Sequence, residues 1–132
     1  MENRLKILLI DDDVDFVEAT RAVLESKNYN VIVAYEGQAG LVKAREEKPD
    51  LILLDIIMPV KNGFTTAEQF KKDPALGKIP VIMLTSFSTK GQGSGIPVSH
   101  GYSLEAEDYV EKPVSPGELL TKVQQFMGKK DL

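Results

Sequence analysis

Acidic, hydroxyl and ammonium side chains stand directly after short strand-like runs of this 132-residue chain. The acids are Asp11, Asp12 and Asp55, the hydroxyl belongs to Thr85, and the ammonium belongs to Lys112. Three carboxylates within a few ångströms of each other cannot all stay ionised unless a cation joins them. Magnesium is a hard ion that carboxylates, waters and phosphate oxygens commonly share. A lysine and a hydroxyl opposite that ion suit phosphoryl oxygens, and a carboxylate can act as the nucleophile. These residue types predict magnesium-dependent phosphoryl transfer.

This site forms only if the strand-like runs lie side by side in one sheet. The runs are Leu5–Ile10, Val31–Ala34, Leu51–Leu54, Pro80–Leu84 and Asp108–Glu111. Helical patterns alternate with them, which is typical of a parallel sheet covered by helices on both faces. We therefore expect an α/β fold, a flavodoxin-like doubly wound five-stranded parallel sheet in the order 2-1-3-4-5. In such a sheet, ligands bind beyond the carboxyl ends of the strands, where the strand order reverses.

Capping residues and apolar spacing locate the first and last helices. Asp13 is predicted to be the N-cap of the first helix. Its buried face is predicted to consist of Phe16, Ala19, Thr20 and Val23, at helical spacing. The last helix is predicted to begin at Pro116, after the N-cap Ser115, with Glu118 completing a capping box.

The segment Phe87–Glu107 occupies the place where the alternation requires a fourth helix. It contains Pro97 and four glycines within eleven residues, namely Gly91, Gly93, Gly95 and Gly101. Inside a helix each glycine costs about 1 kcal/mol relative to alanine, and proline costs about 3 kcal/mol. We therefore expect the fourth helix to be absent or disordered.

Length and composition limit the class of protein. The length suits a single domain over residues 1–132. A net charge of −4 disfavours direct nucleic acid binding, and the absence of cysteine excludes disulfides and thiolate metal sites. No apolar run approaches the roughly 20 residues of a membrane span, and the N-terminal residues lack the apolar region of a secretory signal. We expect a cytoplasmic protein without membrane contact.

Four sequence motifs, in order and at compatible spacings, resemble the receiver domain of bacterial two-component response regulators. These are the acidic pair after the first run, LLDIIMP around Asp55, LTS at the end of the fourth run, and YVEKP around Lys112. The resemblance covers about Leu5 to Met127. It implies a single response-regulator receiver domain whose phosphoacceptor is Asp55, phosphorylated by a sensor histidine kinase, a histidine phosphotransfer protein or a small phosphodonor.

The resemblance also assigns roles to individual residues. Asp12 would bind magnesium directly, Asp11 would act largely through water, and Asp55 and the backbone carbonyl of Ile57 would complete the protein ligands. Thr85 and Lys112 would contact the phosphoryl group. Thr85 and Tyr109 would form the switch that alters a protein-interaction surface for a downstream protein target. Such a domain catalyses only its own phosphorylation and dephosphorylation, so we do not expect an enzyme that turns over a separate substrate.

Other functions fit parts of the sequence. Asp11–Asp13 contains the D-x-D of haloacid dehalogenase-like phosphatases, but Asp15 departs from that motif and the chain is too short for a cap. A flavodoxin-type carrier is disfavoured because acids after the first strand would repel a flavin phosphate. A pseudo-receiver, acting through protein contacts without phosphorylation, is the main alternative.

Overall fold

A computed structural model describes residues 5–55, 63–85, 108–112 and 114–131. The strands are β1 (Lys6–Ile10), β2 (Asn30–Ala34), β3 (Leu51–Asp55), β4 (Val81–Thr85) and β5 (Asp108–Glu111). The helices are α1 (Val14–Glu25), α2 (Gly37–Glu47), α3 (Gly63–Lys72) and α5 (Pro116–Asp131). None of the helices in these described ranges is long and apolar enough to cross a bilayer.

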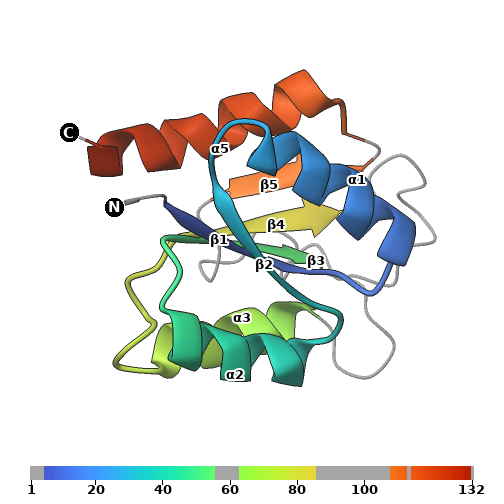
Figure 1. The fold of residues 1–132 in the computed structure, drawn as a ribbon. Helices are drawn as coiled ribbons and strands as arrows, with labels where there is room; N and C mark the ends of the chain where they lie inside the picture. The colour runs from blue at the N-terminus through green and yellow to red at the C-terminus, as the bar shows by residue number, and fades with distance from the viewer. Residues whose placement is uncertain (1–4, 56–62, 86–107, 113, 132) are drawn as a thin grey trace.

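All five strands form one parallel sheet in the order β2-β1-β3-β4-β5, as predicted. Helices α1 and α5 cover one face, and α2 and α3 cover the other (Figure 1). The flavodoxin-like doubly wound architecture is therefore confirmed. The prediction about the fourth helix concerns residues 87–107, which lie outside the described residues.

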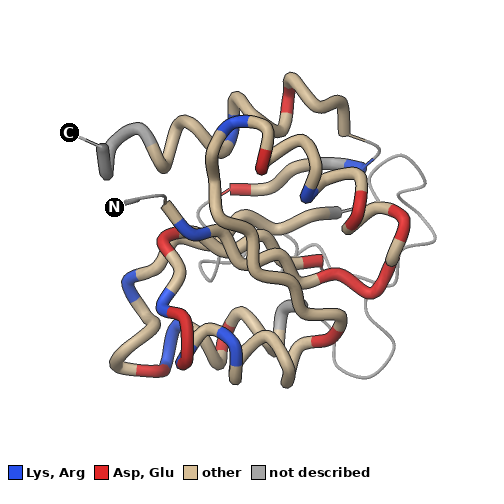
Figure 2. Tube along the Cα trace, viewed as in Figure 1, with Lys and Arg blue, Asp and Glu red and all other residues tan. Residues whose placement is uncertain are grey.

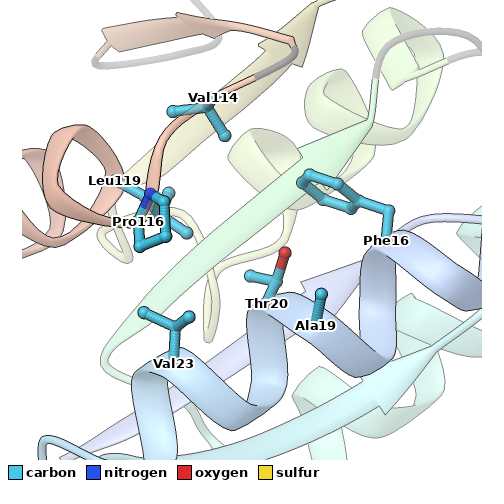
Figure 3. Close-up of a pocket in the computed structure, with 7 residues that line it drawn as sticks. All are labelled: Phe16, Ala19, Thr20, Val23, Val114, Pro116 and Leu119. Carbon is cyan, nitrogen blue, oxygen red and sulfur yellow. The ribbon is translucent and has the colours of Figure 1, made fainter.

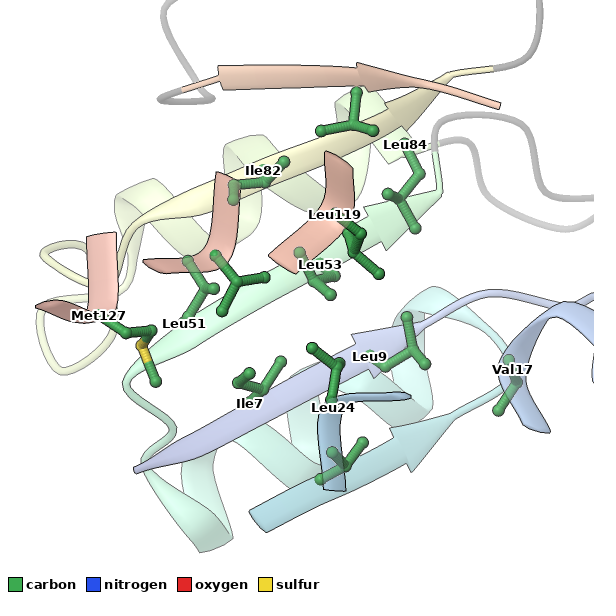
Figure 4. Packing of buried hydrophobic residues seen from close by; sticks show 13 residues of the cluster. Ile7, Leu9, Val17, Leu24, Leu51, Leu53, Ile82, Leu84, Leu119 and Met127 are labelled. Carbon is green, nitrogen blue, oxygen red and sulfur yellow. The ribbon is translucent and has the colours of Figure 1, made fainter. Parts of the chain in front are cut away.

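Alternate strand residues divide the core into two layers, because successive side chains of a strand point to opposite faces. The layer beneath α2 and α3 contains Leu8, Ile10, Ile52, Leu54, Val81 and Met83. The layer beneath α1 and α5 contains Ile7, Leu9, Leu51, Leu53, Ile82, Leu84 and Val110 (Figure 4). Both layers are almost fully shielded from solvent. The apolar runs are continuous because both faces of the sheet are covered.

Both helix starts predicted from caps are observed. Asp13 is the N-cap of α1, and its side chain accepts a hydrogen bond from the backbone N–H of Phe16. Ser115 accepts one from the backbone N–H of Glu118 at the start of α5. The predicted buried face of α1 is partly wrong: the buried residues are Val17, Thr20 and Leu24, whereas Ala19 is exposed. The side of α1 that faces the sheet is offset by about one residue from the predicted side. The four residues that were predicted to be buried line a pocket between α1 and α5.

Helices α2 and α3 are joined by an ion pair near their carboxyl ends. Arg45 Nε lies 3.2 Å from an Asp73 carboxylate oxygen. The backbone N–H of Ala75, together with Arg45, holds the pKa of Asp73 below its ordinary value. At the other end of α2, Gly40 packs directly against Ile10 of β1. The first contact joins α2 to the end of α3, and the second holds α2 against β1, the strand that precedes the first acidic residues.

Candidate functional site: an acidic cluster with one lysine

The register of β1 and β3 brings two of the predicted acids together. Ile10 is the partner of Leu54, so Asp11 and Asp55 stand beside each other at the same edge of the sheet. This edge is the switch point of the sheet, because β2 lies on one side of β1 and β3 on the other. The acids between β1 and α1 and the acid that ends β3 gather there (Figure 2).

The next two strands continue this arrangement. Asp55 is the partner of Leu84, so Thr85 comes one residue beyond it, at the end of β4. Thr85 is the partner of Glu111, and Lys112 follows at the end of β5. The sheet thus carries the four predicted strand-end positions along one edge.

Three carboxylates converge at this edge. One oxygen from each of Asp11, Asp12 and Asp55 lies within 4.8 Å of the others. Asp11 is fully buried, Asp55 is nearly so, and Asp12 is exposed. The backbone N–H of Asp13 donates to Asp11 Oδ1 at 3.0 Å, which fixes that carboxylate.

The cluster has the chemistry of a cation site. Asp11 Oδ2 is buried and has no hydrogen-bond partner among the described residues. A buried acceptor of this kind is costly unless a charged group compensates it. Three close carboxylate oxygens with an open, solvent-facing side at Asp12 match the oxygen ligands and waters that Mg²⁺ prefers. The residues therefore fit a magnesium ion.

Lys112 is the cation that the chain itself supplies. Its Nζ lies 2.8 Å from Asp11 Oδ2 and 3.8 Å from Asp55 Oδ1. The contact with Asp11 is an ion pair that lacks the alignment of a hydrogen bond. The lysine side chain is only 16% exposed, so solvent screens these pairs weakly. One ammonium against three carboxylates leaves the site negative, which favours a further cation.

A family model for the response regulator receiver domain matches residues 7–124. The chain belongs to this family. The receiver match spans the sheet, and the acids and lysine at its edge stand where the sequence motifs predicted them.

Relatives from this family differ in how much of their own length this chain spans. PilH from Pseudomonas aeruginosa is 38% identical over 92% of this chain and 97% of its own length. The transcriptional regulatory protein CpxR from Escherichia coli is 36% identical over 92% of this chain, which spans only 49% of CpxR. The chain therefore spans about half the length of CpxR and similar transcriptional regulators.

A solved receiver structure supplies a comparison with a bound metal. The receiver domain of sensor histidine kinase PA1611 from P. aeruginosa has a TM-score of 0.81 and is 26% identical. The match covers 95% of this chain and 98% of that domain, which was crystallised with a magnesium ion coordinated in its active site cleft.

The predicted site residues fall into four groups in this receiver domain. Asp11, Asp12, Asp55 and Lys112 are brought together. For Thr85 the structure describes the backbone, at the adjacent strand end. Tyr109 is half-buried, and its side chain packs against the core layer beneath α2 and α3. It therefore lies on the face of the sheet opposite α1 and α5. Ile57 lies outside the described residues.

Sequence reasoning missed one neighbour of the cluster. The ring centroid of Phe16 lies 4.3 Å from Lys112 Nζ. The spacing of Phe16 suggested only a core residue, yet it lies one helical turn after Asp12. Side chains on a helix lean toward its N-terminus, and the N-terminus of α1 is at the site. That position was the signal that could have indicated the contact.

Beside this contact, α1, α5 and the segment before α5 line an open apolar pocket of about 100 Å³. Its lining residues are Phe16, Ala19, Thr20, Val23, Val114, Pro116 and Leu119 (Figure 3). The α1 side chains face those of the segment that leads into α5 and of α5 itself. Phe16 thus both lines this pocket and contacts the lysine.

Proposed function

We propose that residues 1–132 form a single phosphoacceptor receiver domain of a two-component phosphorelay. The observation that carries this proposal is the position of Lys112 Nζ, which contacts both Asp11 and Asp55 within a cluster of three carboxylates. This arrangement supplies a nucleophile, a cation site and a fixed positive charge at one edge of the sheet. Family membership supports the same chemistry.

Asp55 is the proposed nucleophile. A carboxylate oxygen of Asp55 forms a bond to phosphorus, and the bond from phosphorus to the donor breaks. With a phosphohistidine donor, the electron pair of that bond returns to the imidazole nitrogen. The product is an aspartyl phosphate, and the reaction depends chiefly on positioning and charge stabilisation.

The proposed magnesium ligands are Asp11, Asp12, Asp55 and the backbone carbonyl of Ile57. When bound, magnesium neutralises phosphoryl oxygens and the carboxylates around it. Asp11 is held in place by the backbone N–H of Asp13, which keeps one carboxylate oriented toward the ion. Exposed Asp12 leaves the entry side open to water.

Lys112 and Thr85 are proposed to bind the phosphoryl group, since Thr85 ends β4, the neighbour of the strand that Asp55 ends, and Lys112 follows β5. Lys112 is within 3.8 Å of an Asp55 oxygen and can pair with a phosphoryl oxygen attached there. Thr85 would then move toward the phosphoryl group, and Tyr109 would respond as the switch residue. This change would reshape the surface that a downstream protein recognises.

The proposed partners are a sensor histidine kinase or histidine phosphotransfer protein, and a protein target. The negative net charge disfavours direct nucleic acid binding by this domain. The proposed location is the cytoplasm. The domain acts as a signalling module whose catalysis is limited to its own phosphorylation state.

Intact-mass spectrometry after incubation with acetyl phosphate tests this proposal. We expect wild-type protein to gain one phosphoryl group with magnesium and none with EDTA. Asp55→Asn should gain none. Asp15→Asn is the matched control, because Asp15 is an exposed acid in the first turn of α1 outside the cluster. It should be phosphorylated like wild type.

A folded wild-type protein that gains no phosphoryl group from acetyl phosphate or from phosphohistidine donors would contradict the proposal. That result would favour the pseudo-receiver, which acts through protein contacts alone. An adduct that persists in Asp55→Asn would place the nucleophile elsewhere.

A further inference from the structure

Lys112 has neighbours on three separate elements. Its ammonium contacts Asp11 after β1, Asp55 at the end of β3, and the ring of Phe16 in α1. Lysine has a long flexible stem, so the position of its charge depends on the groups around the ammonium. The two carboxylates attract it unequally, since Asp11 Oδ2 is 1.0 Å closer than Asp55 Oδ1 (3.8 against 2.8 Å).

The face of Phe16 is a different kind of partner from the carboxylates. An aromatic ring attracts a cation through its quadrupole, at centroid distances up to about 6 Å. The ring carries no net charge and accepts no strong hydrogen bond. It therefore restrains the ammonium without neutralising the charge that a phosphoryl oxygen would need.

Phe16 is itself held firmly. Its backbone N–H donates to the N-cap carboxylate of Asp13 at 3.1 Å, so it belongs to the anchored first turn of α1. Its side chain is half-buried and forms part of the pocket wall opposite Val114 and Pro116 (Figure 3). The ring thus offers Lys112 a surface on a rigid element, and it shields the ammonium from solvent on that side.

We propose that Phe16 is a positioning residue for phosphoryl transfer: its ring face holds the Lys112 ammonium beside Asp55. This inference rests on the proposed function, because it assigns Lys112 to the phosphoryl group. An aliphatic residue of similar size at position 16 would fill the pocket wall but would not attract the cation. A test of this proposal should therefore compare an aromatic with an aliphatic side chain at position 16.

The test compares Phe16→Leu with Phe16→Tyr, which keeps the ring. We expect Phe16→Leu to lower the rate constant for phosphorylation by acetyl phosphate about three- to tenfold, the range of a partly desolvated cation–π contact. Phe16→Tyr should stay within about twofold of wild type by the same reasoning. Magnesium affinity, measured by titration, should be unchanged in both.

A double-mutant cycle distinguishes positioning from packing. In a Lys112→Gln background, Phe16→Leu should have no further effect on the rate, because the cation is gone. An equal loss in both backgrounds would overturn the proposal and assign Phe16 a packing role. Wild-type protein that accepts no phosphoryl group would instead refute the proposed function. Wild type and Phe16→Leu with equal rates would refute only this inference.

NMR of the Lys112 side chain tests the contact independently of phosphorylation activity. In the free protein, the ring face should shift the Lys112 ε-methylene proton resonances upfield. Phe16→Leu should remove that shift, and Phe16→Tyr should retain it. Identical resonances in wild type and Phe16→Leu would contradict the contact, even if the Lys112→Gln background proves too slow to measure.

Discussion

At the scale of single residues, the site holds three negatively charged carboxylates close together, and two of them are buried. Asp11 and Asp55 are shielded from solvent, and Lys112 is the cation that contacts them among the described residues. Carboxylate oxygens within 4.8 Å of one another repel unless a cation lies between them. The arrangement that suits magnesium and phosphate therefore destabilises the metal-free fold.

Asp12→Asn should stabilise the metal-free protein. Removing one charge at this separation relieves repulsion of about 1 kcal/mol in water, so we expect the free energy of unfolding in EDTA to rise by about 0.5–1 kcal/mol. Urea unfolding measures it. Asp15→Asn is the control, because it removes the same charge from the same helix start, where an acid favours the helix dipole. Equal effects of the two substitutions would contradict the repulsion.

At the scale of elements, the sequence predicts where the strands end better than it predicts which side of α1 faces the sheet. Continuous apolar runs ending in Asp11 and Asp55 fixed both the strands and the acids that follow them. The face of α1 was misassigned because Phe16 and Val23 point toward α5, which periodicity alone cannot distinguish from the sheet. The contact of Phe16 with Lys112 depends on how the fold brings the start of α1 to the residue that follows β5, and no local pattern contains that information.

Gly40 shows how closely α2 approaches the strand that precedes the site. A Cβ at this position would collide with the side chain of Ile10, the residue before Asp11. We expect Gly40→Ala to lower the free energy of unfolding by about 1–2 kcal/mol, since overpacking outweighs the better helix propensity of alanine. Gly117→Ala in the first turn of α5 meets no atom within 4 Å and should raise it by about 0.5–1 kcal/mol. Urea unfolding of both variants measures this, and a stabilised Gly40→Ala would disprove the close approach.

At the scale of the whole molecule, the cation site belongs to the centre of the fold. Its acids come from β1 and β3, neighbouring strands in the middle of the sheet with α-helices on both faces. Unfolding separates these strands and destroys the site, so a ligand bound there stabilises the entire domain. This coupling makes global stability a readout of site occupancy that requires no phosphodonor.

Magnesium should therefore shift the urea midpoint of the whole transition without changing its slope. At one hundred times its dissociation constant, a single bound ion adds about 2.7 kcal/mol to the free energy of unfolding. The slope follows the surface exposed on unfolding, which the ion leaves unchanged. Sodium chloride at matched ionic strength controls for screening, and Asp12→Asn should lose most of the gain because it lacks one ligand charge. A magnesium effect no larger than that of sodium chloride would show that the three carboxylates do not form a cation site.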